Sequence, residues 1–491
     1  MRQSGILMHI TSLAGPYGVG TMGKQAYEFV DFLKESGQSC WQILPLTPTG
    51  YGDSPYQSCS TFAGNHYLID LDALIHDGLL EASEVENIDW CWSETKADFG
   101  RLYNNRLNVL RKAYARFWGG EAFDKFCAEN SSWLPDFALF MALKSKFGGK
   151  PWYEWETSLK FRDPDAMWAI RQELKDEIRF YSFVQYLFYT QWTGLRNYAT
   201  EKGIRIIGDV PIYVPLDSVE VWSSPELFQL DETLTPYVVA GCPPDAFTAD
   251  GQLWGNPLYR WDVIEQDGFS WWIRRMGAAS KLYDMIRLDH FRGFEAYWSV
   301  PYGDATARNG KWNKGPGMAF VNALKKGLPE VAFIAEDLGF LTQEVLDLRD
   351  ESGWPGMKVL EFAFDSREDS DYLPHLYPED SVCYTGTHDN VTLKQWFDEA
   401  SPEDVAYAKA YLGLNEEEGF IWGMIRGAMG SVSRLCVVQM QDYLELGKES
   451  RMNFPGKLSM ENWTWRAEEG FDSEVLAKKI FKVTKLYGRA K

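Results

Sequence analysis

The sequence predicts an α/β fold, a (β/α)8 TIM barrel with a large helical insertion and long loops at its rim. Three observations lead to this prediction. Eight short apolar runs end at Gly, Pro, Asp or Thr, as buried parallel strands do. Helical patterns separate several of these runs, and the intervals between the runs are very uneven. Eight strands that alternate with helices are typical of a closed parallel barrel.

The eight apolar runs are the expected barrel strands. They are residues 4–10, 40–46, 204–208, 283–288, 331–335, 357–362, 381–385 and 435–440. Amphipathic helical patterns follow the first run, at 23–37, and the fifth run, at 342–353. We therefore expect residues 1–491 to form a single catalytic barrel chain into which longer segments are inserted.

Two long intervals interrupt the alternation. The interval after the second run carries extended helical patterns at 102–118 and 164–199, so residues 75–200 are expected to form an inserted, mainly helical subdomain. The interval after the third run contains GCPPDAFTADGQLWGNPLY (241–259), which is rich in Pro, Gly and Asp. Residues 210–282 are therefore expected to be an inserted loop region over the active site.

Composition excludes several classes of protein. The 45% hydrophobic and 15% aromatic content is ample for a packed core. The net charge of −21 argues against nucleic acid and anionic membranes as partners. The seven cysteines are scattered and never spaced as CxxC, which suits a reducing compartment. No run approaches the ~20 apolar residues of a membrane span. We expect a soluble, cytoplasmic protein.

Acidic side chains follow four of the predicted strands, at the ends where barrel enzymes carry their chemistry. They are Asp209 after the third run, Asp289 after the fourth, Glu336 and Asp337 after the fifth, and Asp389, preceded by His388, after the seventh. One acid after a strand is usually a helix cap or an ion-pair partner. Four strands that each deliver an acid to the same rim point instead to metal binding or to acid–base work on a glycosidic bond.

The residues favour the glycosidic reaction. The chain has six histidines with no HxH or HExxH pair, so no metal is expected. Arg287 shares a strand face with Asp289 and favours its charged form, as a nucleophile requires. Glu336 follows an apolar run, and its desolvation would raise its pKa, as a proton donor requires. Asp389 could bind sugar hydroxyls and favour a distorted, oxocarbenium-like ring.

A glycine motif, GVGTMG (18–23), fits the dinucleotide-binding pattern GxGxxG. That pattern requires a strand immediately before it and an acidic residue at the end of the next strand. Pro16 and Tyr17 intervene here, and the next strand ends in LPL. We therefore interpret these glycines as a tight loop and expect no nucleotide cofactor.

Several segments resemble a known family. GDVPIYV (208–214), RLDHFRGF (287–294), IAEDLG (334–339) and GTHDN (386–390) resemble, in order, the four signature segments of the α-amylase clan. Their variant forms, together with WQILPL, SPYQS (54–58), GCPPDAF, WGNPLY and RMNFPG (451–456), are similar to those of the amylomaltases, the disproportionating 4-α-glucanotransferases. The resemblance extends to NWTWR (462–466) and so covers essentially the whole chain.

The resemblance implies a retaining transfer of α-1,4-glucan segments from malto-oligosaccharides to an acceptor glucan or glucose. It implies no metal, no organic cofactor and no C-terminal β-sandwich. The implied catalytic residues are Asp289 as nucleophile, Glu336 as general acid/base and Asp389 as transition-state stabiliser. The implied substrate-binding residues are Arg287, His388 and Asp209 around the cleaved sugar, and Ser54, Tyr56, Asp245, Trp254 and Asn453 along the glucan groove.

Two rival functions remain at this point. A hydrolytic α-glucosidase or amylase would use the same three carboxylates, and a non-catalytic glucan-binding protein would not need an ionised Asp289. Maltotriose distinguishes transfer from hydrolysis, because transfer gives longer oligosaccharides plus glucose whereas hydrolysis gives smaller sugars alone.

Trp254 is expected to shield the intermediate from water and to stack on the acceptor. The sequence leaves the oligomeric state and the preferred donor and acceptor lengths undetermined.

Overall fold

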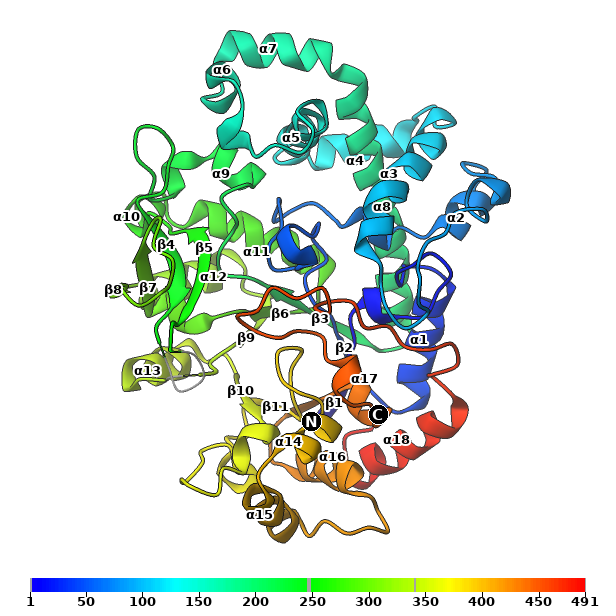
Figure 1. Ribbon diagram of the computed structural model, residues 1–491, viewed down its shortest axis with the longest axis vertical. Helices are drawn as coiled ribbons and strands as arrows, with labels where there is room; N and C mark the ends of the chain where they lie inside the picture. The colour runs from blue at the N-terminus through cyan, green and yellow to red at the C-terminus, as the bar shows by residue number, and fades with distance from the viewer. Residues whose placement is uncertain (1, 245–248, 340, 491) are drawn as a thin grey trace.

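A closed eight-stranded parallel barrel forms the centre of the molecule (Figure 1). The computed structural model describes residues 2–244, 249–339 and 341–490. The barrel strands are β1 (Gln3–Leu7), β2 (Cys40–Gln42), β3 (Arg205–Val210), β6 (Met285–Leu288), β9 (Ala332–Ala335), β10 (Gly356–Val359), β11 (Ser381–Tyr384) and β12 (Leu435–Gln439). Each predicted run forms one of them, and the predicted TIM barrel is confirmed.

The strand order of the sheet is β10-β11-β12-β1-β2-β3-β6-β9. The amide of Ala335, at the end of β9, donates to the carbonyl of Pro355, just before β10, over 2.9 Å and closes the ring. Strands β3 and β6 pair in parallel with Asp209 opposite Arg287. Gly208 leaves room for the ring of Tyr283, just before β6, because a Cβ there would lie 2.1 Å from that ring.

The helices that cover the barrel bury one apolar face. In α1 (Lys24–Glu35) this face includes Phe29 and Leu33, spaced one helical turn apart. The ring of Phe29 packs edge-on against Trp41 of β2, with centroids 5.1 Å apart. The other covering helices are α11 (Ser270–Leu282), α12 (Gly317–Gly327), α13 (Gln343–Ser352), α14 (Leu393–Glu399), α15 (Pro402–Leu412), α16 (Phe420–Gly430), α17 (Met440–Tyr443) and α18 (Glu474–Leu486).

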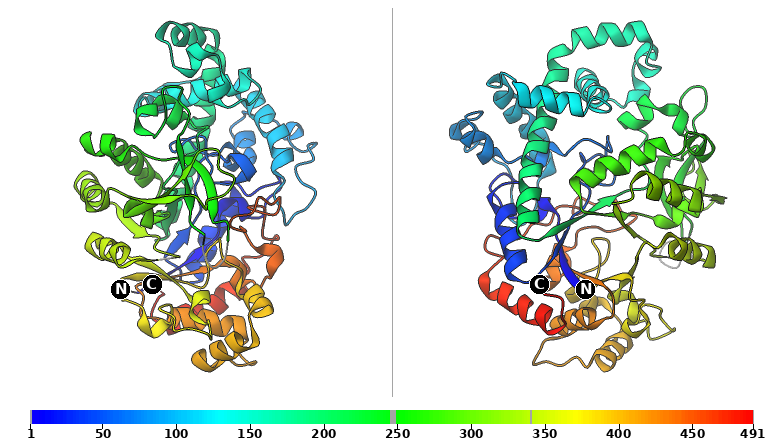
Figure 2. Two further views of the ribbon diagram at one scale, coloured as in Figure 1. Left: turned by 60° about the vertical axis from the view of Figure 1, so that its left-hand side comes forward. Right: turned by 180° about the vertical axis from the view of Figure 1, so that it is seen from behind.

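The interval between β2 and β3 is mainly helical, as the patterns indicated. It contains α2 (Leu71–His76), α3 (Phe99–Ala115), α4 (Glu121–Glu129), α5 (Leu134–Lys146), α6 (Thr157–Lys160), α7 (Pro164–Glu173) and α8 (Lys175–Glu201). The helical pattern at 164–199 is divided between α7 and α8, which are interrupted at Leu174. Helix α8 runs from this helical group down to the barrel (Figure 2), where Trp192 donates to the carbonyl of Leu282.

The interval 210–282 differs from the expected loop. It contains α9 (Val219–Ser223), β4 (Val238–Cys242), β5 (Gln252–Pro257), α10 (Trp261–Gln266) and α11. Strands β4 and β5 belong to a second, antiparallel sheet of order β5-β4-β7-β8, completed by β7 (Ala296–Pro301) and β8 (Lys311–Lys314). The sheet joins distant segments through short strands, so no local pattern reveals it. Trp254 therefore lies on a strand and not in a loop.

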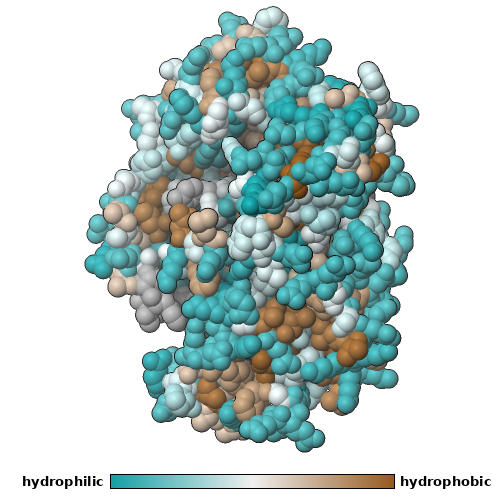
Figure 3. Space-filling view, turned by 45° about the vertical axis from the view of Figure 1, so that its right-hand side comes forward, coloured by the Kyte–Doolittle hydropathy of each residue, from teal (hydrophilic) through white to brown (hydrophobic). Residues whose placement is uncertain are grey.

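After β12 the described residues form α17 and α18 and no further strand, so they contain no β-sandwich. The two ends of the chain lie close together in all views (Figures 1 and 2). Hydrophilic side chains dominate the face shown in Figure 3, in keeping with 70 acidic and 49 basic residues. Among the described residues, none of the helices combines the length and the apolar character that a bilayer crossing needs.

Candidate active site

Arg287 lies at the centre of a cluster of carboxylates at the carboxyl ends of β3 and β6. It is buried, with a side chain only 3% exposed. Its Nη1 atom donates to both oxygens of Asp209, over 2.8 and 2.7 Å, and to Oδ1 of Asp289 over 3.0 Å. The contact with Asp289 confirms that residues two apart at this strand end share a face. One guanidinium nitrogen is therefore shared between two carboxylates.

Asp209 is also held from the rim. The hydroxyl of Tyr56 donates to Oδ2 of Asp209 over 2.8 Å. The ring of Tyr56 stacks on His388, with centroids 5.2 Å apart and planes inclined by 16°. The Ser54 hydroxyl accepts the amide of Tyr56 over 3.2 Å, which shapes the turn that presents the tyrosine. Tyr56 thus links Asp209 to His388 across the mouth of the barrel.

Glu336 follows β9, and two backbone amides orient its carboxylate. Oε2 accepts the amide of His290 over 2.7 Å, and Oε1 accepts the amide of Leu338 over 2.9 Å. His290 has a φ of 50°, a left-handed conformation that is uncommon for a residue other than glycine. Because His290 directly follows Asp289, this turn brings Glu336 beside the backbone of the residue expected to be the nucleophile.

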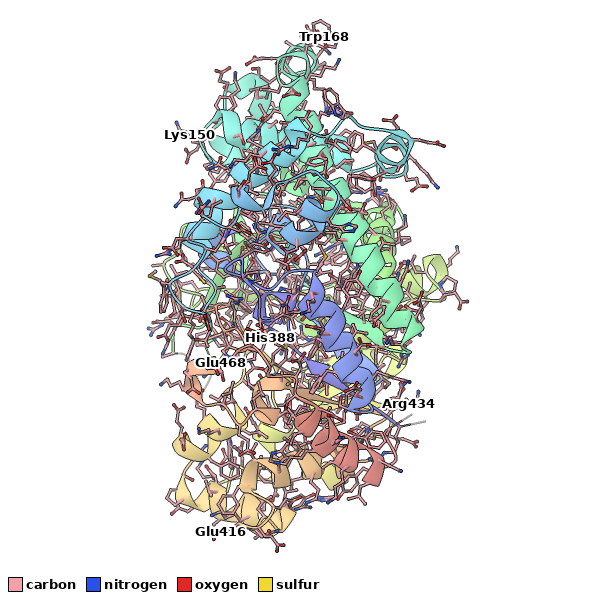
Figure 4. The ribbon with its side chains drawn as sticks, turned by 90° about the vertical axis from the view of Figure 1, so that its right-hand side faces the viewer. Lys150, Trp168, His388, Glu416, Arg434 and Glu468 are labelled. Atoms are coloured by element: carbon pink, nitrogen blue, oxygen red, sulfur yellow. The ribbon has the colours of Figure 1, made fainter. Side chains whose placement is uncertain are left out.

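Asp389 approaches from the loop after β11. The side-chain amide of Asn453 donates to its Oδ1 over 2.6 Å, and Nε2 of His388 lies 3.4 Å from its Oδ2. The guanidinium of Arg451 donates to the carbonyl of Asp389 over 2.8 Å. The RMNFPG segment therefore fixes both the backbone and the side chain of Asp389. Figure 4 shows His388 near the middle of the molecule, and the residue is buried.

The pKa values in this cluster are set by burial and by the single buried cation. Burial raises the pKa of Asp289, while Arg287 lowers it. Burial likewise raises the pKa of Glu336, and the negative charge of Asp289 raises it further. Asp289 receives the direct hydrogen bond from Arg287, whereas Glu336 receives only neutral backbone donors. Asp289, which receives the direct hydrogen bond from Arg287, therefore lies in surroundings more favourable to a negative charge than Glu336 does.

The remaining expected site residues lie toward the rim. Trp254, on β5, meets His290 edge to face with centroids 4.8 Å apart. Its indole nitrogen donates to the side chain of Gln252 over 3.2 Å. Asp245, which was expected in the groove, lies outside the described residues. In the described part of the chain, no group of three or more His, Cys, Asp or Glu side chains is arranged to hold a metal ion.

Two functional contacts were missed from the sequence. The hydrogen bond from the His290 amide to Glu336 could not be predicted. The direction of that amide depends on the left-handed conformation of His290, which the sequence does not indicate. Arg451 donates to the backbone carbonyl of Asp389 and not to its carboxylate, so a search for oppositely charged pairs does not predict this contact. The RMNFPG segment itself was the signal that could have found Arg451.

A family model described as 4-alpha-glucanotransferase matches residues 8–472. The chain belongs to the 4-alpha-glucanotransferase family. A 4-alpha-glucanotransferase from Clostridium butyricum is 49% identical over 98% of this chain and 100% of its own length. Another from Thermus thermophilus is 48% identical over 96% of this chain and 95% of its own.

Solved structures agree with this membership of the 4-alpha-glucanotransferase family. The amylomaltase from Streptococcus agalactiae in complex with acarbose superimposes with a TM-score of 0.97, is 42% identical and covers the whole of both chains. The amylomaltase from Corynebacterium glutamicum, at 18% identity and a TM-score of 0.80 over 75% of its chain, shares the fold. The chain is thus an enzyme of the glucanotransferase type.

Proposed function

We propose that this chain moves α-1,4-glucan segments from a donor malto-oligosaccharide to the 4-hydroxyl of an acceptor glucan or glucose. The reaction retains anomeric configuration and passes through a covalent glycosyl–Asp289 ester. The observation that supports it most strongly is the unequal environment of two neighbouring carboxyl groups. Asp289 is paired with a buried guanidinium, while Glu336, on the adjacent strand, is held by neutral amides. That difference separates a nucleophile from a proton donor.

The first step breaks the glycosidic bond. A carboxylate oxygen of Asp289 attacks the anomeric carbon, and the bond to the departing glucan breaks as Glu336 gives its proton to the glycosidic oxygen. Arg287 stabilises the ionised Asp289 before attack. Retention requires the two carboxyl groups to lie about 5–5.5 Å apart. Their placement on hydrogen-bonded neighbours, β6 and β9, suits such a separation.

The second step transfers the glycosyl group. Glu336, now ionised, takes the proton from the 4-hydroxyl of the acceptor, whose oxygen attacks the anomeric carbon and releases Asp289. Asp389, oriented by Asn453, binds sugar hydroxyls and favours the flattened ring of the transition state. His388 and Asp209 bind the same sugar. Transfer and hydrolysis differ only in whether a sugar or a water enters in this step.

The other expected roles stay proposals on the same basis. Ser54, Tyr56, Trp254 and Asn453 are assigned to the glucan groove, as is Asp245, which lies outside the described residues. The S. agalactiae amylomaltase was solved with acarbose, which supports a glucan-like ligand for this chain too. We divide residues 1–491 into the barrel, a helical subdomain at 75–200 and a segment at 210–282 that covers the site.

We also propose a cytoplasmic location for this enzyme. The cysteine thiols at 59, 91, 127, 383 and 436 are free. Thiols persist in a reducing compartment, whereas secreted proteins usually pair them.

Maltotriose tests the proposed reaction directly. The wild-type chain should convert it into a ladder of longer malto-oligosaccharides plus glucose, resolved by chromatography. Asp289→Asn should reduce this activity by about 10³-fold or more, because the nucleophile is lost. Asp350→Asn, at an exposed position away from the cluster, is the matched control. Smaller sugars alone would identify a hydrolase, and an unaffected Asp289→Asn variant would refute the covalent mechanism.

A further inference from the structure

The two ring nitrogens of His388 have different surroundings. Nε2 faces Asp389, with 3.4 Å between Nε2 and Oδ2. Nδ1 is buried and has no hydrogen-bond partner among the described residues. A buried polar atom without a partner costs about 1–3 kcal/mol. The proposed mechanism does not account for this atom, although the side chain is only 3% exposed and belongs to the site.

A small cavity lies beside His388. Its volume is about 10 Å³, which is near the lower limit for one water molecule. His9, His388, Gln439 and Gln441 give it a polar lining. A buried water normally makes about three hydrogen bonds, and this lining offers enough partners.

His9, which follows β1, also lines this cavity. Its Nδ1 accepts the backbone amide of Leu44 over 3.2 Å, so its proton is on Nε2. Burial, together with the neighbouring His388, lowers the pKa of His9 to about 3, and the ring is therefore neutral at physiological pH. A neutral His9 in this tautomer can donate one hydrogen bond, from Nε2.

We propose that His9 is a positioning residue that sets the tautomer of His388 through one water molecule bound in this cavity. Nε2–H of His9 donates to the water, and the water donates to Nδ1 of His388. His388 then carries its proton on Nε2 and donates toward Asp389 and the bound sugar. The other tautomer would direct the lone pair of Nε2 at the Asp389 carboxylate and repel it. The catalytic consequence rests on the proposed function.

Two substitutions of His9 separate its two nitrogens. The carboxamide oxygen of asparagine occupies the position of Nδ1, so His9→Asn keeps the acceptor for the Leu44 amide but loses the donor to the cavity. The carboxamide nitrogen of glutamine occupies the position of Nε2, so His9→Gln keeps that donor. We expect His9→Asn to lower kcat roughly tenfold, as loss of an outer orienting partner does at other sites. His9→Gln should stay close to wild type.

The tautomer itself is measured by NMR on protein labelled with ¹⁵N-histidine, without substrate. The signals of His388 are assigned by their loss in His388→Gln. Wild type and His9→Gln should show His388 protonated on Nε2, and His9→Asn should show a mixture. Wild-type protein protonated on Nδ1 would overturn the proposal, even if neither variant folds.

Activity that is kept in His9→Asn but lost in His9→Gln would also overturn it, because His9 would then serve only to hold Leu44. Failure of the maltotriose test would instead remove the proposed function and leave the tautomer result standing.

Discussion

At the scale of single residues, the site depends on how one buried cation serves several acids. The pairing of Arg287 with Asp289 could be predicted, because alternate residues of a strand share a face. The raised pKa of Glu336 could also be predicted from the apolar run before it. The contact between Asn453 and Asp389 could not be derived from spacing, since it joins residues from separate loops. The family resemblance assigned both residues to the site but did not indicate that they touch.

Replacing Arg287 by Gln should change the pH dependence of the reaction. Arg287 lowers the pKa of both Asp289 and Glu336, so its removal raises both. In the proposed reaction Asp289 must be ionised to attack, and Glu336 must be protonated to donate. Both limbs of the profile of kcat/KM against pH should therefore move to higher pH, with a lower maximum. The measurement is the initial rate of glucose release from maltotriose across the pH range, with Arg434→Gln as the control. A lower maximum with unmoved limbs would show that Arg287 acts only in binding.

At the scale of elements, the sequence predicted the strands of the barrel better than the antiparallel sheet. Barrel strands are continuous apolar runs because both of their faces are buried. Strand β5 has a mixed, partly exposed composition, and its partner β4 is also joined to β7, from another segment. A short strand that is stabilised by distant pairing carries little local signal. This is why Trp254 was placed in a loop.

Trp254→Ala tests the element that carries this residue. We expect the ratio of transfer to hydrolysis to fall, because the variant loses an indole that packs on His290, beside Asp289, and that is proposed to shield the intermediate from water. The ratio follows from the glucose, maltose and longer products formed from maltotriose. Trp168→Ala is the control, since this side chain is 68% exposed at the far end of the molecule (Figure 4). An unchanged ratio in Trp254→Ala would exclude the shielding role.

The loop that carries His388 and Asp389 is anchored by a buried carboxyl group. Asp442, in α17 just after β12, accepts the hydroxyl of Thr385 over 2.7 Å and the amide of Leu393 over 2.8 Å. These two contacts hold the loop at both of its ends. Burial raises the pKa of Asp442 to about 7. The acid is therefore a structural support whose charge state varies within the physiological range.

Asp442→Asn should change how stability depends on pH. The folded pKa of Asp442 lies above its usual value of about 4, so the folded chain holds this proton more tightly. The resulting stabilisation is complete below about pH 4 and is lost as the pH rises through about 7. Asparagine does not titrate, so the Tm of the variant relative to wild type should rise between about pH 4 and pH 7 and stay level above that range. Thermal unfolding at several pH values measures the difference; a constant difference would contradict the prediction.

At the scale of the whole molecule, the barrel predicted from eight runs and their spacing is present, with its active cluster at the carboxyl ends of the strands. The packing at the amino ends of the barrel strands could not be predicted. Arg489 is fully buried and donates to the carbonyls of Gln3, Met429, Ser431 and Ser433 over 2.8 to 3.0 Å. An arginine near the end of a chain is usually interpreted as a solvated charge. Here it joins β1 to the segment before β12.

Arg489→Met should be strongly destabilising. The methionine fills part of the volume but leaves buried carbonyls without this donor, which we expect to lower the free energy of unfolding by about 3 kcal/mol or more. Urea unfolding measures this change. Arg434→Met is the matched control, because Arg434 lies at the surface (Figure 4) in an exposed pair with Asp380, and its loss should cost less than about 1 kcal/mol. Equal effects would show that the buried hydrogen bonds add nothing.

The antiparallel sheet also restricts how Trp254, in the segment proposed to cover the site, can move. Trp254 lies on β5, β5 is hydrogen-bonded to β4, and β4 to β7, which begins shortly after Asp289 in the chain. Trp254 and Asp289, the proposed nucleophile, are thus linked through one hydrogen-bonded sheet. Because β5 is already paired with β4, ordering Trp254 when a glucan binds costs less conformational entropy than ordering an unpaired loop would.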